Sequence, residues 1–414
     1  MIYDTIIVGA GAAGLFSAAS YSPGTKGLIL EKTKKAGTKL LMSGSGQCNF
    51  THSGSIKDFL TRYGPNGTKL RPILYPFHNL ALMDYFQSKG IALRIREDGK
   101  VFPDSLRAQD ILDVLMHEAK QKGFLIKYET PVTDIKWDDP LYSVYSGKEK
   151  WTAKKLIVAT GGRSYPATGS DGSMYAILKS LDIQISTPKP ALVPIFAEQY
   201  PYSDLAGISF ENAAVSVKNS RASNSDKPAT TLKGALLFTH DAFSGPVILD
   251  ASRYAHTGAQ LLINYIPDQK PDDLAKLLKN QISGNKKQVE TMLSDALGIP
   301  RRFADCICMR LGISGTAASL SGSQIQKITS LLTCDAFSIS GVGGFNSAMA
   351  TAGGVLLDEI HLKTMESKKY PRMHIIGEAL DVDGDTGGYN LQFAFSSGFA
   401  AAQNRPAQSE PAKS

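Results

Sequence analysis

The chain has 414 residues, of which 43% are hydrophobic and 20% charged, so it is long enough for roughly two or three domains with substantial cores. Its 45 Lys and Arg against 38 Asp and Glu give a formal net charge of +7, which favours anionic partners such as nucleotides. With four cysteines and no CxxC pair, neither a zinc site nor a disulfide framework is supported, and a reducing cytoplasm is the expected location.

The N-terminus resembles a signal peptide only superficially. Asp4 stands where a basic region is needed, and glycines interrupt the apolar run. No uninterrupted apolar stretch reaches the ~18 residues that a membrane span needs, so we expect no membrane partner. The densest basic run, residues 31–39, has no interleaved aromatic residues, so we expect a solvated face there and no nucleic-acid partner.

Short apolar runs that end in glycine or an acid recur at both ends of the chain. Residues 5–8 and 28–31 read as buried strands on either side of a helix of small residues, 12–21. The same pattern returns much later at 156–160 and 374–377. Continuous apolar runs of this length are typical of the parallel strands of an α/β sheet.

The central part of the chain has a different texture. Short β-rich segments dominate up to about residue 266, and a helical period then continues to about residue 332. This pattern predicts a discontinuous α/β domain with two insertions and a disordered tail. The predicted boundaries are 1–190 and 334–404 for the α/β domain, 191–270 for the β-rich domain, 271–333 for the helical domain and 405–414 for the tail.

A nucleotide fingerprint follows the first strand directly. Gly9, Gly11 and Gly14 have G-x-G-x-x-G spacing at the start of the first helix, and Glu31 ends the second strand. These glycines allow a tight turn, close approach of the backbone to a pyrophosphate, and close packing of helix on strand. The carboxylate is placed to accept hydrogen bonds from ribose hydroxyls, so the sequence predicts dinucleotide binding.

Three further stretches distinguish FAD from NAD. They are the strand and glycines at 158–162, a glycine-rich loop at 39–51, and the segment 375–398, in which a strand is followed by a helix that starts near Gly388. Together they resemble the bacterial three-domain flavoproteins that include aminoacetone oxidase and a bile-acid-pathway reductase. The resemblance covers the chain apart from its tail, and includes "GKVFPDS" at 99–105 and "LLFTHDAFSGP" at 236–246.

The resemblance implies the fold, the cofactor and its site. The fold would be α/β, a Rossmann-like FAD-binding domain of the two-dinucleotide-binding flavoprotein type, with an inserted β-rich domain that carries substrate and an inserted helical domain. FAD would be held by residues of six segments: Gly9, Gly11, Ala13 and Gly14; Glu31, Lys32 and Lys39; Ser43, Gly44, Gly46, Gln47, Cys48 and Asn49; Val132; Thr160, Gly161 and Gly162; and Gly377, Glu378, Asp383, Gly388, Tyr389, Asn390 and Leu391.

Residues 381–392 also permit a second interpretation. The alternating Asp381, Asp383 and Asp385 resemble the start of a calcium loop, but Thr386 and Gln392 replace the turn glycine and the closing glutamate. We therefore expect no metal, and expect the N–H groups from 387 to 391 to face the flavin N1–C2=O edge, where a helix N-terminus stabilises negative charge.

Several side chains near these motifs have more than one possible role. Cys48 is either a redox thiol or a small residue that packs a tight loop, and the second is favoured. His240 is either a proton donor or acceptor or a structural histidine. Gln47 stands where the family usually has Arg, which removes a cation near the cofactor or an acidic substrate. No catalytic residue is assigned, because flavin carries the hydride chemistry.

The expected activity is that of an FAD-dependent oxidoreductase that moves a hydride between a small organic substrate and flavin. Oxygen would accept electrons from an oxidised amine, or NAD(P)H would supply them to a carbonyl or unsaturated compound. The alternatives are a flavin-binding regulatory module and an NAD-dependent dehydrogenase. Residues 44–49 and 341–346 lack the third glycine of the fingerprint, so no separate NAD(P)H domain is expected. Oligomeric state is left open.

Overall fold

The computed structural model describes residues 1–218 and 230–403, and the chain forms two compact units. The first contains residues 1–191 together with the chain from 345 onward, and the second contains 192–344. Each unit has its own hydrophobic core. The predicted tail at 405–414 lies outside the described residues. Within those residues no helix is long and apolar enough to cross a bilayer.

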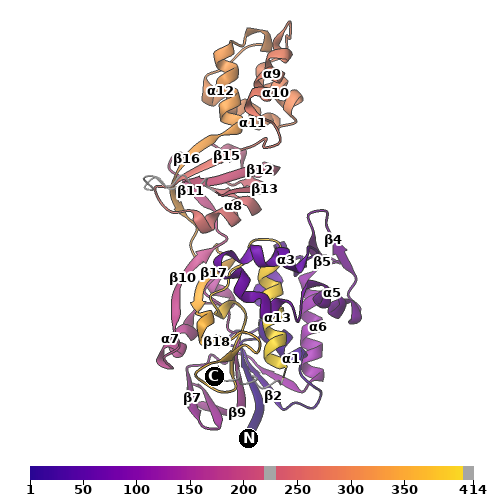
Figure 1. Cartoon of the computed structure of the whole chain (residues 1–414), viewed down its shortest axis with the longest axis vertical. Coiled ribbons are helices and arrows are strands. Elements are labelled where there is room, and N and C mark those ends of the chain that lie inside the picture. The colour runs from indigo at the N-terminus through magenta and orange to yellow at the C-terminus, as the bar shows by residue number, and fades with distance from the viewer. Residues whose placement is uncertain (219–229, 404–414) are drawn as a thin grey trace, which may run out of the picture. The chain divides into compact units, whose positions relative to one another are not determined.

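The first unit is built on a mixed sheet whose centre is parallel (Figure 1). Its path runs through β18 (Ile360–His361), β19 (Glu366–Ser367), β20 (Met373–Ile375), β9 (Glu149–Val158), β1 (Ile2–Val8), β2 (Gly27–Leu30) and β6 (Phe124–Lys127). The hairpin of β7 (Asp134–Asp138) and β8 (Leu141–Ser146) pairs with the start of β9. All of β2 and the last four residues of β1 are buried, as expected for strands covered on both faces.

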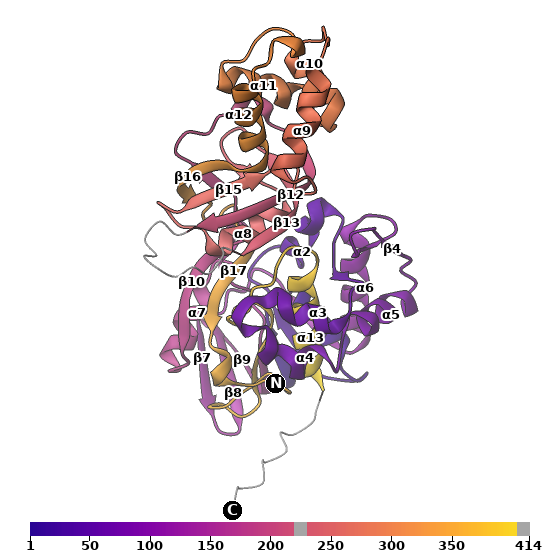
Figure 2. The ribbon, with the colours of Figure 1, turned by 45° about the horizontal axis from the view of Figure 1, so that its top comes forward.

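Three helices pack together beside this sheet. Helix α1 (Ala12–Ala19) contacts both α6 (Ala108–Gln121) and α13 (Tyr389–Ala402), so the first and last helices of the unit are neighbours. The remaining helices of the unit are α2 (Thr38–Met42), α3 (Ile56–Phe59), α4 (Arg71–Leu74), α5 (Asn79–Ser88) and α7 (Ser173–Ser180). In Figures 1 and 2, α13 lies beside α3, and α13 also contacts α4.

Two small sheets complete the first unit. A three-stranded antiparallel sheet contains β3 (Thr51–His52), β5 (Lys100–Pro103) and β4 (Leu93–Ile95). A two-stranded sheet pairs β10 (Ile185–Ala191) with β17 (Ala350–Val355). The strands β10 and β17 are therefore the outgoing and returning connections between the two units in sequence.

The second unit is a closed six-stranded barrel with a helical layer (Figure 2). The barrel order is β11 (Ile195–Ala197), β14 (Phe243–Ser244), β13 (Thr231–Phe238), β12 (Ser209–Lys218), β15 (Gln260–Asn264) and β16 (Asp335–Val342). Helix α8 (Pro246–Ala251) packs on β12 and β13. Between β15 and β16 the chain forms α9 (Pro271–Ile282), α10 (Val289–Leu297), α11 (Arg301–Leu311) and α12 (Gly322–Thr333).

The return from the insertions differs from the sequence boundary at 333–334. Strand β16 pairs with β11 and β15 and closes the barrel, so the chain re-enters the first unit only at Phe345. The apolar alternation of β16 has the period of a half-buried strand, with Asp335, Phe337 and Ile339 buried. Within the segment 236–246, Phe243 is buried in the barrel core, whereas His240 is exposed.

A buried ion pair connects the helical layer to the barrel. Arg310 of α11 donates from two guanidinium nitrogens to the Asp335 carboxylate, at 2.8 and 3.0 Å. The hydroxyls of Tyr202 and Tyr265 donate to the same carboxylate, which is 5% exposed. Four donors therefore satisfy a carboxylate that would otherwise be costly to bury.

We expect Asp335→Ala to destabilise the second unit by roughly 3–5 kcal/mol, because it leaves a largely buried guanidinium without its partner. Urea unfolding of the whole chain measures the change. Asp305→Ala is the matched control, since Asp305 forms a half-exposed pair with Arg301 at 3.4 Å, and such pairs contribute ~0–1 kcal/mol. Equal unfolding midpoints for the two variants would contradict this account of the barrel–helix connection.

Candidate dinucleotide-binding site

The motifs predicted from sequence meet at one edge of the parallel sheet. Val8 of β1 is paired in register with Leu30 of β2 and with Val158 of β9, and Val158 is paired with Ile375 of β20. The residues that follow each strand therefore lie next to one another along the carboxyl edge. These residues are Gly9, Glu31, Thr160 to Gly162, and Gly377 with Glu378.

The three fingerprint glycines lie in three different structural environments. A Cβ at Gly14 would lie 2.1 Å from the Gly9 carbonyl oxygen, so Gly14 is required for α1 to pack on the strand turn. Gly9 has φ +104°, in the left-handed region that side chains avoid. Gly11 has φ −85°, and a Cβ there would have no heavy atom within 4 Å. The protein itself does not require glycine at position 11, so the space in front of it fits a ligand that approaches the backbone.

Two helix N-termini present unsatisfied donors at this edge. The N–H groups of Ala13 and Gly14 in α1, and of Asn390 and Leu391 in α13, have no acceptor among the described residues. Gly11 and Gly388 are the N-cap residues of these helices and have no side chain to cap them. Such termini attract anions, which fits the pyrophosphate of a dinucleotide at α1 and negative charge at α13.

Glu31 is held rigidly at the end of β2. One carboxylate oxygen accepts from the Ala10 N–H at 2.8 Å, and the other accepts from the N–H and hydroxyl of Thr33, each at 2.8 Å. The carboxylate retains lone-pair capacity for hydroxyl donors. Val132 follows on the next loop, which is tied to Glu31 by the Thr130 N–H, and its own backbone makes no hydrogen bond to described residues. The arrangement fits a ribose at Glu31 and an adenine beside Val132.

The loop after β9 contains two buried hydroxyls that lack partners. Thr160 Oγ1 and Ser170 Oγ are fully buried and make no hydrogen bond within the described residues. Buried hydroxyls without partners are rare, because each loses its hydrogen bonds to water. Gly161 follows Thr160 in the chain and lies close to Ser170, since a Cβ there would be 2.8 Å from Ser170 Oγ. A polar ligand along this loop accounts for both hydroxyls.

An ion pair between Lys39 and Glu378 links three segments of the edge through Ser164. The sequence predicted Lys39 and Glu378 as site residues, but not Ser164. Lys39 of α2 donates to the Glu378 carboxylate at 2.5 Å and also to Ser164 Oγ. Ser164 is fully buried, donates to the other Glu378 oxygen at 2.5 Å, and its N–H donates to Thr351 Oγ1. Ser164 follows "ATGG" by two residues, and that position was the available signal. Lys32, by contrast, pairs with Asp171 at 2.6 Å.

The loop at 43–49 is shaped by its own hydrogen bonds. Ser43 Oγ donates to the Leu40 carbonyl at 2.6 Å, and the Cys48 N–H donates to the Ser43 carbonyl at 2.9 Å. Gly44, Gly46 and Cys48 all have left-handed backbone, with φ of 56°, 86° and 60°. Burial raises the pKa of the Cys48 thiol to about 12, so it stays protonated at neutral pH, which is consistent with a packing role.

The loop at 43–49 has a cation beside it, although it carries Gln47 in place of the usual arginine. Its side-chain oxygen accepts a hydrogen bond of 2.6 Å from Nη2 of Arg96, which follows strand β4. The sequence departure at position 47 therefore removes an arginine from the loop itself, but a guanidinium from another element lies against the same position.

The segment 381–392 is built around α13 and its neighbours. Asp381 accepts from the Gly353 N–H and from Ser186 Oγ, each at 2.9 Å, and Asn390 forms reciprocal hydrogen bonds with Gly384. Asp383 lies between these two anchored positions and is partly buried. Among the described residues no three His, Cys, Asp or Glu side chains gather as a metal site would require.

Tyr389, the first residue of α13, is buried between rings. It stacks on His52 at 5.5 Å between ring centroids and meets Phe59 edge-on at 4.9 Å. In the amide orientation that satisfies both ends of Asn49, its oxygen accepts from the Gly388 N–H at 3.1 Å. The loop at 43–49 is therefore attached directly to the start of α13.

The whole chain matches proteins of known family. Residues 3–404 match the family model described as HI0933-like protein Rossmann domain. The chain belongs to the HI0933-like family. It is 32% identical over 413 residues to ribosomal RNA dihydrouridine synthase of Escherichia coli (strain K12), covering 97% of this chain and 98% of that protein.

Two further proteins are similar over most of their length. The 3-dehydro-bile acid delta(4,6)-reductase of Clostridium scindens is 26% identical over 409 residues, covering 96% of this chain and 97% of the relative. The solved 3-ketosteroid-delta4-(5alpha)-dehydrogenase of Rhodococcus jostii RHA1 shares the fold, with a TM-score of 0.50, 14% identity and 97% of each chain covered.

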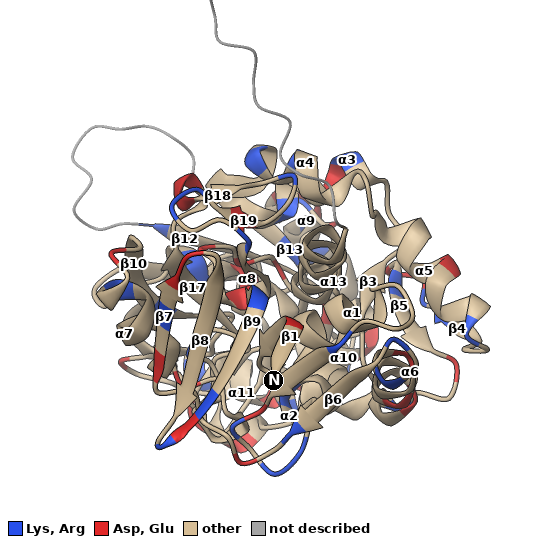
Figure 3. Ribbon diagram, turned by 90° about the horizontal axis from the view of Figure 1, so that it is seen from below, with Lys and Arg blue, Asp and Glu red and all other residues tan. Residues whose placement is uncertain are grey.

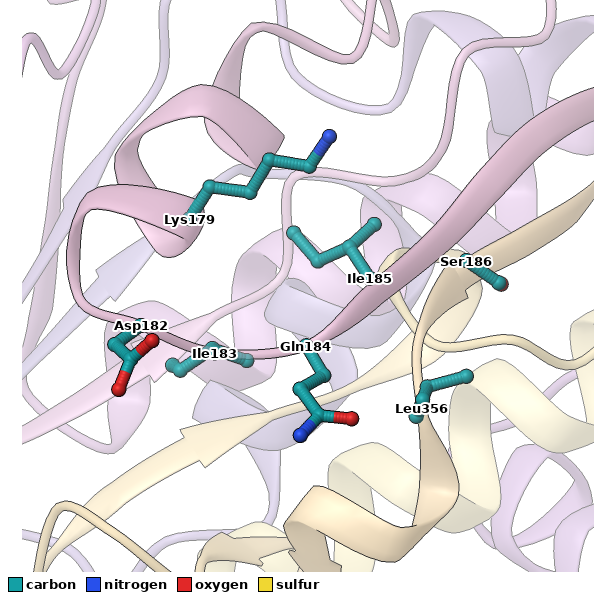
Figure 4. Close-up of a pocket in the computed structure, with 7 residues that line it drawn as sticks. All are labelled: Lys179, Asp182, Ile183, Gln184, Ile185, Ser186 and Leu356. Atoms are coloured by element: carbon teal, nitrogen blue, oxygen red, sulfur yellow. The ribbon is translucent and has the colours of Figure 1, made fainter.

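Family and fold make this HI0933-like protein an FAD-dependent oxidoreductase, with FAD as its cofactor. The expected α/β fold class with a Rossmann-like FAD-binding domain is confirmed, and the predicted β-rich insertion is an antiparallel barrel. The dinucleotide edge has the donors and the open glycine approach that FAD requires, so the residues present fit the cofactor. A shallow depression between α7, β10 and Leu356 (Figure 4) is lined by none of the predicted cofactor residues.

We expect Gly11→Val to abolish FAD retention without unfolding the chain. The new side chain would occupy only the space that the cofactor needs, since no protein atom lies within 4 Å of its Cβ. FAD per chain after gel filtration and the melting temperature of the apoprotein measure the two effects. Gly322→Val is the control, because a Cβ at that helix start also meets nothing within 4 Å. Full flavin content in a folded Gly11→Val protein would contradict the placement.

Proposed function

We propose that the protein reduces a carbon–carbon double bond conjugated to a carbonyl group, and that its substrate is uridine in ribosomal RNA. This proposal departs from the expectation, drawn from the basic run at 31–39, that the chain has no nucleic-acid partner. The observation that carries this proposal is the 32% identity to a ribosomal RNA dihydrouridine synthase along almost the entire chain. The name of the bile-acid relative also denotes reduction of conjugated double bonds. In uridine the C5=C6 bond is conjugated to the C4 carbonyl, so both names describe one class of bond.

The proposed reaction adds two hydrogens to the pyrimidine ring. Bound FAD, in its reduced form, would supply the hydride, and a proton from water would complete the saturation of C5=C6. The chain itself binds and orients the cofactor. In this proposal Gly11, Ala13 and Gly14 hold the pyrophosphate, and Glu31 accepts from the ribose hydroxyls.

The remaining edge residues would hold the flavin half. Thr160 and Ser170 supply hydroxyls to polar cofactor atoms, and the ion pair of Lys39 with Glu378 keeps the neighbouring loops in place. The N–H groups of Asn390 and Leu391 stabilise the negative charge of reduced flavin by ~0.3–2 kcal/mol. This stabilisation favours a flavin that is readily kept reduced until the substrate arrives.

Uridine reduction can be tested on RNA that lacks the modification. Ribosomal RNA purified from cells without this gene should gain dihydrouridine when incubated with the holoenzyme and a chemical reductant. Nucleoside mass spectrometry detects the gain of two hydrogen atoms. If the RNA is unchanged while a conjugated 3-oxo steroid is reduced, the substrate is a small molecule. If neither reacts, the flavin-binding regulatory alternative gains support.

The electron donor generates a separate prediction. The glycine-rich stretch 341–346 begins inside barrel strand β16, which contains Gly341. It therefore does not join a strand to a helix as a nucleotide-binding turn does. We therefore expect NADH and NADPH to reduce the flavin slowly and without micromolar saturation. Anaerobic stopped-flow absorbance at the flavin band measures this. Fast reduction that saturates tightly would show a nicotinamide site in the chain.

A further inference from the structure

Arg96 is held in a fixed orientation at the tip of the β4–β5 hairpin. Its backbone N–H donates to the Lys100 carbonyl at 3.0 Å, which closes the turn. Its guanidinium carbon lies 4.1 Å from the centroid of the Phe102 ring, and Nη2 donates to Gln47 Oε1 at 2.6 Å. Stacking on one side and a hydrogen bond on another restrict an exposed side chain that would otherwise sample many rotamers.

Arg96 differs from the other cations of this hairpin in its partners. Arg94 pairs with Asp104 at 3.0 Å, and Lys100 pairs with Asp98 at 2.6 Å. Within the described residues no carboxylate lies at ion-pair distance from Arg96, although the Asp98 carboxylate is near enough to interact with its charge. Among these residues Gln47 is the one acceptor of the Arg96 guanidinium. A guanidinium has five N–H donors, so most of its donor capacity remains for a ligand.

Several cations elsewhere on the first unit form ion pairs with neighbouring carboxylates. Figure 3 shows blue and red residues side by side around β7, β8 and β9. Three ion pairs account for this pattern: Lys136 with Asp134, Lys127 with Glu149, and Lys154 with Asp4. Within the hairpin, Arg96 differs from Arg94 and Lys100 because its oriented guanidinium forms no ion pair.

The position of Arg96 connects it to the cofactor edge. Gln47 lies two residues before Asn49, whose amide accepts from the Gly388 N–H at the start of α13. The loop from 43 to 49 thus has the α13 terminus on one side and the guanidinium on another. Arg96 is exposed, so a substrate that reaches the loop from solvent can meet it.

We propose that Arg96 positions the RNA substrate by binding a phosphate of the strand that carries the reduced uridine; this inference rests on the proposed function. The planar guanidinium matches the geometry of a phosphate in a bidentate pair. Gln47 and Phe102 position Arg96 before the substrate binds. Phosphate contact fixes where the strand lies and leaves recognition of the base to other residues.

The test is the salt dependence of RNA binding to the holoenzyme. The probe is a labelled single-stranded oligoribonucleotide of uridines, titrated at several salt concentrations. Arg96→Met should weaken binding about 10-fold and lower the salt slope by roughly one ion. Arg94→Met removes the same charge from the same hairpin and should change affinity less than about 2-fold. Flavin content should be unchanged in both.

Arg96→Lys keeps the positive charge but removes the planar guanidinium group. It should keep the wild-type salt slope and still weaken binding, because an ammonium forms neither the stack nor a bidentate pair. The assignment is overturned if Arg96→Met matches Arg94→Met in both affinity and slope while wild-type protein forms dihydrouridine. A wild-type protein that neither binds the RNA nor forms dihydrouridine overturns the proposed function together with this assignment.

Discussion

The close packing of α1 on the turn after β1 is the constraint on which the rest of the first unit depends. Gly14 approaches the Gly9 carbonyl so closely that even a Cβ would lie 2.1 Å from it. This contact brings the N-terminus of α1 to the carboxyl edge of the sheet. The three neighbouring strands are fixed in register with β1, directly or through β9, and deliver their own terminal residues to the same edge.

The second helix at that edge comes from the far end of the chain. Helix α13 packs against α1, and Gly398 has the same role there as Gly14 has at the strand, since a Cβ would lie 2.6 Å from the Ala13 carbonyl oxygen. The N-termini of α1 and α13 thus both present unsatisfied N–H groups at the carboxyl edge of the sheet. Their positive ends favour a ligand with negative charge at both a pyrophosphate and a reduced flavin.

Much of this edge was predictable because local sequence patterns encode it. The spacing of Gly9, Gly11 and Gly14, the acid at position 31 and the strand before Gly161 are short-range features with one physical reading each. The start of α13 at Tyr389 was also placed within a residue or so. Which of these residues contact the cofactor stays a prediction, since the geometry supports binding without testing each residue.

What could not be predicted depends on contacts between distant segments. Ser164 joins Lys39 to Glu378 across more than a hundred residues on either side, and its place after "ATGG" does not reveal those two partners. Arg96 contacts Gln47 because the pairing of β4 with β5 places it there. From the sequence, the absence of arginine at position 47 indicated only that a cation was missing. Strand β16 was assigned to the wrong unit because its barrel partners, β11 and β15, precede it by about 70 to 150 residues.

The most direct test of the account is hydrogen–deuterium exchange of the backbone amides at the two helix N-termini, compared between apoprotein and FAD-loaded protein. Peptides that contain Ala13 and Gly14, and peptides that contain Asn390 and Leu391, should exchange more slowly when FAD is bound, because these amides gain acceptors. Peptides from the barrel strands β12 and β13 serve as the internal reference. Unchanged exchange at both termini on saturation with FAD would contradict the claim that this edge holds the cofactor.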